Sequence, residues 1–198
     1  MIERAGGIVR TVRLELPDWS IPWNELDRAI TDKTRLLILN NPMNPCGKVF
    51  TLDELHELAK RVEKHHLYVL SDEVYEHLLA DKQKHIPFQT LPGMYERTLR
   101  VSSAGKMFAL TGWKIGFLMG SRALLSKASK IHQFLVFSVA PALQTGVALG
   151  LQEGDKWFQM QNETLNHQRD ILEKGLSSAR FDVFPSKGTY FIIARPHA

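Results

Sequence analysis

Two lysines and a hydroxyl group lie close together in SSAGKMFALTGWKIGF, residues 102–117. Lys106 follows Ser103 after two intervening residues, and Lys114 comes about two helical turns later. An amine can form a Schiff base with an aldehyde, and hydroxyl and cationic groups bind phosphate. The segment therefore predicts a site for a ligand that carries both an aldehyde and a phosphate. An ordinary exposed turn is the alternative, because lysine is common and S-x-x-K is a short pattern.

Two other motifs that use the same residue types do not match. S-x-x-K also occurs in serine β-lactamases and penicillin-binding proteins, but the sequence has no S-D-N triplet, and residues 187–189 read KGT rather than KTG. A phosphate-binding P-loop fails as well. Neither Gly-Lys pair, at 47–48 or 105–106, has the required earlier glycine together with a following Ser or Thr.

An acid and a phenol follow the apolar run LYVL, in the segment SDEVYE. A carboxylate at the carboxyl end of a strand, here Asp72, can hold a pyridine nitrogen protonated, and the cationic ring then withdraws electrons from a substrate carbon. Tyr75 could reach a phenolic oxygen on the same ring. The alternative is a helix N-terminus, where the helix dipole favours acidic residues.

A third polar segment, NNPMNPCGK, follows the apolar run RLLILN. Asn44 lies there in a turn bounded by two prolines. Its amide could donate a hydrogen bond to the same phenolic oxygen, or it could simply stabilise its own turn.

The apolar runs that must position these residues have the character of strands. Four of them, at 35–40, 67–73, 97–103 and 114–120, alternate with helical patterns. This order predicts an α/β fold with a mostly parallel sheet, in which ligands bind at the carboxyl ends of the strands. The nearly continuous apolar run at 35–40 predicts a strand buried on both faces.

Further elements are expected on both sides of this region. We expect a strand within 6–15, a short helix over 23–30, and a helix from Thr51 that begins with a Thr51–Glu54 capping box. Leu52, Leu55, Leu58 and Val62 would form its apolar stripe. Helices over 121–135, 141–152 and about 156–179 follow, and then strands at 181–184 and 188–194. We divide the chain into a partial large domain, 1–153, and a connecting helix with the start of a small domain, 154–198.

Composition narrows the class of protein. The chain has 198 residues, of which 44% are hydrophobic, and a formal charge of +4 that is scattered rather than gathered into a stripe. These values indicate a soluble globular protein without a nucleic-acid or membrane role. The single cysteine, Cys46, excludes an internal disulfide, so a cytoplasmic location is expected. No signal peptide pattern is present at the N-terminus.

The order of the motifs NNPMNPCGKVF, SDEVYEHL, SSAGKMFALTGWKIGF and IHQFLVFSVAPALQ resembles the fold-type I aminotransferases. The branch that it resembles contains the kynurenine/glutamine and methionine aminotransferases. The resemblance covers essentially the whole chain. It implies a three-layer α/β large domain and the cofactor pyridoxal 5'-phosphate. It also implies transamination between an amino acid and a 2-oxo acid, and a homodimer in the full-length form.

The resemblance also implies roles for the residues above. Lys106 would be the Schiff-base lysine and would move the proton between substrate and cofactor carbons. Asp72 would pair with the pyridine nitrogen, Asn44 and Tyr75 with the phenolic oxygen, and Ser103 and Lys114 with the phosphate. Aromatic residues within 132–137 resemble the lining of the substrate entrance, although a helix packing face is equally consistent with them.

Some family features have no counterpart here. The glycine-rich phosphate segment, the ring-stacking aromatic residue and the carboxylate-binding arginine would lie outside these 198 residues. We therefore expect a chain cut at both ends that exposes apolar surface and self-associates. A carbon-sulfur β-lyase with the same cofactor and a catalytically inactive fragment remain alternative functions.

Overall fold

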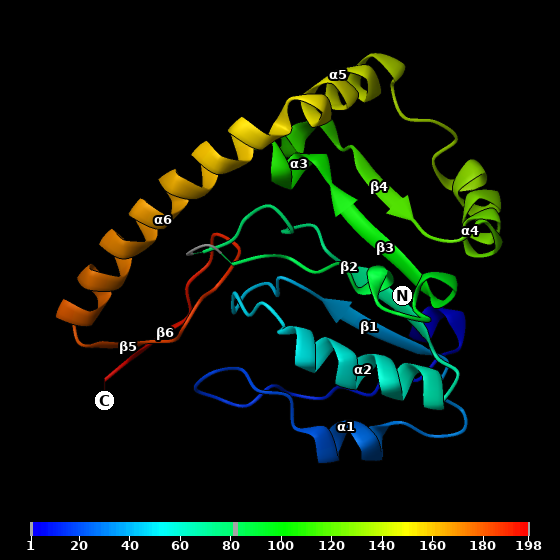
Figure 1. The fold of residues 1–198 in the computed structure, drawn as a ribbon, viewed down its shortest axis with the longest axis horizontal. Helices are drawn as coiled ribbons and strands as arrows, with labels where there is room; N and C mark the ends of the chain where they lie inside the picture. The colour runs from blue at the N-terminus through cyan, green and yellow to red at the C-terminus, as the bar shows by residue number, and fades with distance from the viewer. Residues whose placement is uncertain (1, 81–82, 198) are drawn as a thin grey trace.

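The computed structural model describes residues 2–80 and 83–197 and is built around a four-stranded sheet (Figure 1). Its strands are β1 (Leu36–Asn40), β2 (Tyr68–Asp72), β3 (Thr98–Ser103) and β4 (Gly116–Met119), in the spatial order β1-β2-β3-β4. β1, β2 and β3 are parallel, whereas β4 runs antiparallel to β3. The predicted mostly parallel α/β sheet is thereby confirmed.

Helix α2 (Leu52–Lys64) covers one face of β1 and β2. It begins with the predicted capping box: the Thr51 hydroxyl accepts a hydrogen bond from the Glu54 N–H at 3.2 Å, and the Glu54 carboxylate accepts from the Thr51 N–H at 2.8 Å. Leu55, Leu58 and Val62 are buried against the sheet, as their spacing predicts. Leu52 is largely exposed because it lies in the first turn of the helix.

The short helix α1 (Trp23–Ala29), also predicted, packs beside α2 (Figure 1). The guanidinium of Arg61 on α2 lies 4.5 Å from the centre of the Trp23 ring and forms an ion pair with Asp27 at 2.6 Å. This contact joins the two helices at their polar surface, while Leu26 of α1 enters the core.

Three expectations about the strands are wrong. Residues 7–14 form no strand, because an alternating pattern also needs a ladder partner, and only a single bridge between Glu15 and Ser20 forms there. β1 is not buried on both faces: Leu36 and Ile38 are 45% and 50% exposed, since the helical layer covers only the opposite face. The second C-terminal strand begins at Ala194 rather than within 188–193, which form only one bridge, from Gly188 to Leu79.

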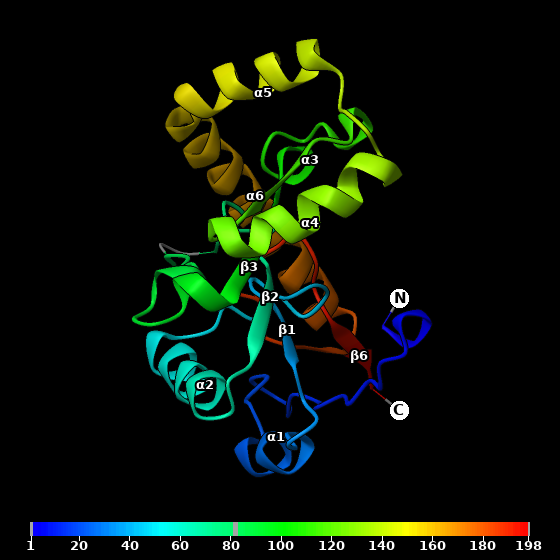
Figure 2. The ribbon, with the colours of Figure 1, turned by 90° about the vertical axis from the view of Figure 1, so that its right-hand side faces the viewer.

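The three helices after β4 form an arm that runs past one side of the sheet and leads back to the C-terminal strands (Figure 1 and Figure 2). The short helix α3 (Ala104–Met107) follows β3, and the predicted helices α4 (Arg122–Leu135), α5 (Pro141–Gln152) and α6 (Gly154–Ser178) follow β4. α6 begins close to the boundary expected at 153/154, but the division into two domains stays a prediction. Strands β5 (Phe181–Val183) and β6 (Ala194–Pro196) form a separate antiparallel pair. The 3-10 helices are η1 (Glu3–Ala5), η2 (Phe88–Thr90), η3 (Tyr95–Arg97) and η4 (Thr111–Trp113).

None of the helices in the described part of the chain has the length and apolar character needed to cross a membrane.

Candidate functional site

The parallel strands bring the predicted site residues to one edge of the sheet. Asp72 is the last residue of β2 and lies in register with Val101 of β3, so both strands end at the same edge. Ser103 ends β3, and Lys106 follows within α3. An acid, a hydroxyl and an amine from two neighbouring strands therefore share the carboxyl edge, where ligands bind in open α/β sheets.

The amine of Lys106 lies among aromatic rings. Its Nζ atom is 3.2 Å from the hydroxyl oxygen of Tyr190, to which it donates a hydrogen bond. It also lies 5.7 Å from the ring centre of Tyr75 and 5.9 Å from that of Tyr190, within cation–π range of both. The structure thus brings together two residues predicted for the site, Lys106 and Tyr75, with a third that was not predicted.

Asn44 and Tyr75 also meet, although they lie on different loops. The Asn44 side-chain amide donates to the Tyr75 hydroxyl at 3.3 Å. The Asn44 N–H donates to the Asn40 side-chain oxygen at 2.7 Å, and the Asn40 amide donates to the Asp72 carbonyl at 3.0 Å. Asn40 therefore ties the loop of Asn44 to the end of β2 and sets the position of the Asn44–Tyr75 pair.

Burial disfavours the charged forms of the acid and the phenol. Burial raises the pKa of the Asp72 carboxyl, and the adjacent Glu73 charge adds to this effect, whereas the N–H of Val74, 3.4 Å away, opposes it. Within residues 2–80 and 83–197 no side-chain cation pairs with Asp72. Burial also raises the pKa of Tyr75, with a further contribution from Tyr190. Tyr75 is therefore a neutral phenol that can donate a hydrogen bond.

Ser103 and Lys114 lie at the junction of β3 and β4. Ser103 is paired with Gly116, and the Ala104 N–H donates to the Ile115 carbonyl at 3.2 Å, which brings Lys114 to the same end of the sheet as Ser103. Ser103 precedes α3 without capping it through its side chain, so its hydroxyl is available to a ligand. Lys114 has a left-handed backbone and an exposed side chain. Their predicted phosphate-binding role stays a prediction.

A buried ionic network stands directly behind the site. Glu73, which follows Asp72, accepts hydrogen bonds from the Ser71 hydroxyl at 2.6 Å and from the Phe88 N–H at 3.0 Å. His85 and Arg100 lie 2.7 Å from its second carboxylate oxygen. Arg100 also pairs with Glu76, which accepts from the Ser102 hydroxyl as well. Arg100 forms ion pairs with both carboxylates, so the network holds the end of β2 in place.

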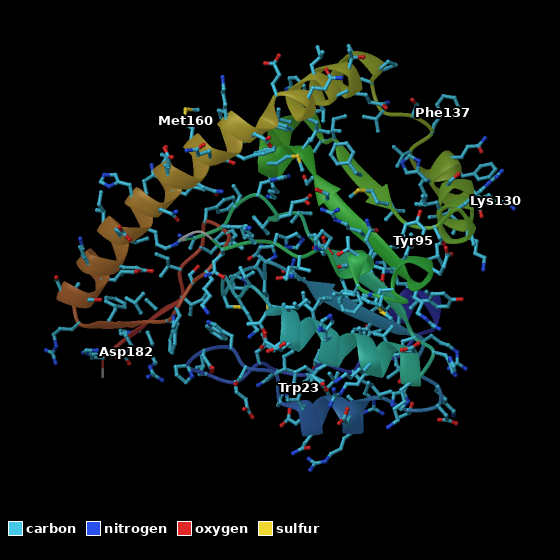
Figure 3. The ribbon with its side chains drawn as sticks, in the orientation of Figure 1. Trp23, Tyr95, Lys130, Phe137, Met160 and Asp182 are labelled. Carbon is cyan, nitrogen blue, oxygen red and sulfur yellow. The ribbon has the colours of Figure 1, made fainter. Side chains whose placement is uncertain are left out.

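The aromatic residues of 132–137 belong to the part of the chain that follows β4. They end α4 and begin the following turn, where Phe134 and Phe137 are 88% and 82% exposed. Phe137 lies at the periphery of the molecule (Figure 3). A groove beside β4 and α5 includes His132 and Phe137 in its lining. One interpretation of the sequence was that these rings form a helix packing face. The exposure of Phe134 and Phe137 contradicts that interpretation.

Tyr190 is the site residue that the sequence did not reveal. It lies 84 residues after Lys106, and no spacing rule connects positions so far apart. Its signal was the segment GTYF, which we interpreted as part of a strand. Tyr190 instead lies in an irregular segment, and its ring meets that of Tyr75 edge-on, with 5.4 Å between the centres and 82° between the planes.

Comparison with known proteins places this geometry in a family. A family model described as aminotransferase class I and II matches residues 1–198. A kynurenine–oxoglutarate transaminase of Dictyostelium discoideum is 43% identical over 179 residues, which are 88% of this chain and 41% of that protein. A methionine aminotransferase of Escherichia coli K12 is 34% identical over 192 residues, 97% of this chain and 50% of that protein.

Solved structures agree with the sequence relatives. The N-succinyldiaminopimelate aminotransferase of Mycobacterium tuberculosis superimposes with a TM-score of 0.90 at 38% identity, over 96% of this chain and 50% of that one. The chain spans about half the length of the relatives that it matches. The resemblance on which the sequence prediction rested is confirmed, and the chain belongs to the aminotransferase class I and II family.

Proposed function

We propose that the protein is a pyridoxal 5'-phosphate-dependent aminotransferase that exchanges the amino group between an amino acid and a 2-oxo acid. The observation that carries the proposal is the position of the Lys106 amine, 5.7 Å from the ring centre of Tyr75 at the edge where Asp72 ends β2. A free amine, an acid and a neutral phenol at one edge are the groups that an aldehyde-bearing pyridine ring requires.

The residues present fit this cofactor. Asp72 is half-buried and has no cationic side chain beside it within residues 2–80 and 83–197, so a protonated pyridine nitrogen would offset its desolvation. Asn44 and Tyr75 already form a pair of donors for a phenolic oxygen. Ser103 offers a hydroxyl and Lys114 a cation at the junction beside Lys106. Lys is a point charge rather than a planar fork, which suits a phosphate without fixing its orientation.

Each of these side chains would then have a defined task. When bound, pyridoxal phosphate would supply a conjugated ring that withdraws electrons from the substrate carbon. Lys106 would hold the aldehyde carbon and, once displaced by the substrate amine, would carry a proton at its Nζ atom. Asp72 would keep the ring nitrogen protonated, and Asn44 with Tyr75 would orient the ring through its phenolic oxygen.

The names of the relatives support a substrate class. Kynurenine is aromatic and methionine contains sulfur, and two of the matching proteins are named for these amino acids, whereas another is named for N-succinyldiaminopimelate. We propose aromatic, sulfur-containing or glutamine-like amino acids as donors. A homodimeric assembly, which the family resemblance suggests, and a cytoplasmic location, which the single cysteine suggests, are further parts of this proposal.

The test is covalent capture of the cofactor. Pyridoxal phosphate is added to the chain, the mixture is reduced with borohydride, and the modified lysine is identified by peptide mass spectrometry. We expect a visible absorbance band before reduction and modification at Lys106 afterwards. Lys106→Ala should abolish both signals and lower any transamination rate by a factor of at least about 100.

The matched control is Lys130→Ala, which removes an exposed lysine on α4 (Figure 3). It should leave the band and the site of modification unchanged. A band that persists in Lys106→Ala, or modification spread over surface lysines in the unaltered chain, would overturn the proposal.

A further inference from the structure

The segment 186–191, which we call the strap, crosses the site from the C-terminal part of the chain. Its backbone is held on two loops. The Lys187 N–H donates to the Gly47 carbonyl at 2.8 Å, on the loop that carries Asn44. The Lys187 carbonyl accepts from the Ala80 N–H at 2.8 Å, and the Thr189 N–H donates to the Leu78 carbonyl at 2.7 Å, on the segment that follows Tyr75. The strap is therefore a bridge between the two loops that flank Lys106.

Close packing reinforces these backbone bonds. Gly47 has a φ of +69°, and a Cβ atom there would lie 2.0 Å from the Ser186 hydroxyl oxygen. A Cβ atom on Gly188 would lie 2.9 Å from Pro42 and 3.0 Å from Val49. The backbones of the strap and the Asn44 loop are thus in direct contact, with no room for a side chain between them. This contact fixes the distance between the two segments.

Helix α6 holds the strap from the other side. Arg169 donates to the Thr189 carbonyl at 2.9 Å, and Thr189 is fully buried. Asn162, about two turns earlier on α6, accepts from the Leu79 N–H at 3.1 Å. One helix therefore ties down both the strap and the segment on which the strap lies. Tyr190 follows Thr189 directly, so these contacts fix its backbone, and its ring contacts with Tyr75 and Phe191 orient its side chain.

The clamp places the Tyr190 hydroxyl 3.2 Å from the Lys106 Nζ atom and sets its ring edge-on to Tyr75. Tyr190 is still 44% exposed, so its other side stays open to an incoming molecule. A long lysine side chain otherwise samples many rotamers, and ordering it costs free energy. A fixed hydroxyl acceptor lowers the number of conformations in which the amine can lie.

We propose that Tyr190 is a positioning residue that holds the Lys106 amine at the carboxyl edge of the sheet, ready to meet an aldehyde. The proposal rests on the proposed function for the identity of that aldehyde. The hydrogen bond between Lys106 and Tyr190 forms without any cofactor. Tyr190 acts through Lys106 rather than on the substrate.

The first test needs no cofactor. All lysines are acetylated with a trace of acetic anhydride, and the relative rate at each lysine is measured by mass spectrometry. Acetylation requires the reagent to reach the lone pair of the Lys106 amine, and the hydrogen bond that this amine donates to the Tyr190 hydroxyl limits the positions from which the amine can react. Tyr190→Phe keeps the ring but removes the hydroxyl, so we expect acetylation of Lys106 to rise about fivefold relative to the other lysines. Tyr95→Phe, which alters an exposed tyrosine in η3, is the matched control and should change nothing.

The second test measures capture of pyridoxal phosphate at Lys106 by borohydride. Tyr190→Phe should slow capture about fivefold, because the released amine must be ordered again at each encounter. A general loosening of the fold would also raise acetylation of the buried Lys48, whereas loss of positioning should change Lys106 alone. Equal acetylation of Lys106 in the unaltered chain and in Tyr190→Phe would overturn the inference. Failure of the unaltered chain to capture pyridoxal phosphate would instead overturn the proposed function, while the acetylation result would stand.

Discussion

The sheet with α1 and α2 and the arm formed by α4, α5 and α6 differ sharply in how they bury their apolar residues. A single cluster of buried side chains joins α1, α2, β1 and β2, with Leu55 and Val62 fully buried. Helix α4, in contrast, buries no residue, and α5 buries only Val147. Amphipathic helices usually owe their stability to packing. The comparison shows that burial of apolar side chains stabilises the sheet with α1 and α2, whereas it contributes little to α4 and α5.

The site draws on both regions unequally. The packed region supplies Asp72, Tyr75 and Asn44. Tyr190 comes from the strap, which follows α6 in the sequence. The comparison therefore predicts that the packed region sets the stability of the chain and that substitutions on the arm leave it nearly unchanged. Three experiments test this, from the largest expected effect to the smallest.

Arg100→Met should have the largest effect. Arg100 is the cation that forms ion pairs with the buried Glu73 and its neighbour Glu76, and its removal leaves uncompensated carboxylates beneath the sheet edge. We expect a loss of about 3–5 kcal/mol in the free energy of unfolding, measured by urea denaturation at pH 7. The control is Arg195→Met, which breaks an exposed pair with Asp182 and should cost less than about 1 kcal/mol. If both variants lost the same free energy of unfolding, the buried ion pairs of Arg100 would contribute no more to stability than the exposed pair of Arg195.

Leu55→Ala and Leu149→Ala compare the same substitution in the two regions. Leu55 on α2 is fully buried, whereas Leu149 on α5 is 60% exposed. Leu55→Ala should lower the free energy of unfolding by about 2–5 kcal/mol, through lost burial and the cavity left behind. Leu149→Ala should change it by at most about 0.5 kcal/mol. If denaturation curves showed a comparable loss for Leu149→Ala, the arm would have to be packed in solution.

Asp27→Asn should have the smallest effect, and that effect should depend on pH. The hydrogen bond from Arg61 holds the pKa of Asp27 below its ordinary 3.8. Because the folded pKa is the lower one, the pair stabilises the fold above the ordinary pKa and loses that contribution as the pH falls through the folded value. Asp27 is half exposed, so Asp27→Asn should cost at most about 1 kcal/mol at pH 7.

Once the pH lies below the folded pKa of Asp27, the Asp27→Asn and unaltered chains should unfold at the same urea concentration, and high salt at pH 7 should narrow their difference. A difference that grew as the pH fell would show that the sign of this linkage is wrong.

Local signals were sufficient for most elements. The capping box at Thr51 and Glu54 and the stripe of Leu55, Leu58 and Val62 predict α2, because helix formation depends on neighbours within a turn or two. The grouping of Asn44, Asp72 and Lys106 was predicted from the rule that ligands bind at the carboxyl ends of parallel strands, together with the resemblance to the fold-type I aminotransferases. The roles of these three residues toward a cofactor stay predictions.

The failures share a cause, since each depended on a partner far away in the sequence. The alternation in 8–14 is that of a strand, yet no neighbouring strand pairs with it within the described residues. The run at 36–40 looks doubly buried, but what covers each face is decided by other elements. Tyr190 reaches Lys106 only because α6 and the strap bring it there. Sequence periodicity records none of these long-range contacts.

Lys106 and its hydroxyl partner Tyr190 are separated by 84 residues, so the ribosome synthesises them at different times. During synthesis at about 5–20 residues per second, the amine leaves the ribosome roughly 4–17 s before Tyr190 does. Strands β1, β2 and β3 can pair in that interval. The contact between Lys106 and Tyr190 forms later, because it closes a long loop of chain. During that interval the nascent chain carries the Lys106 amine without the hydroxyl that positions it.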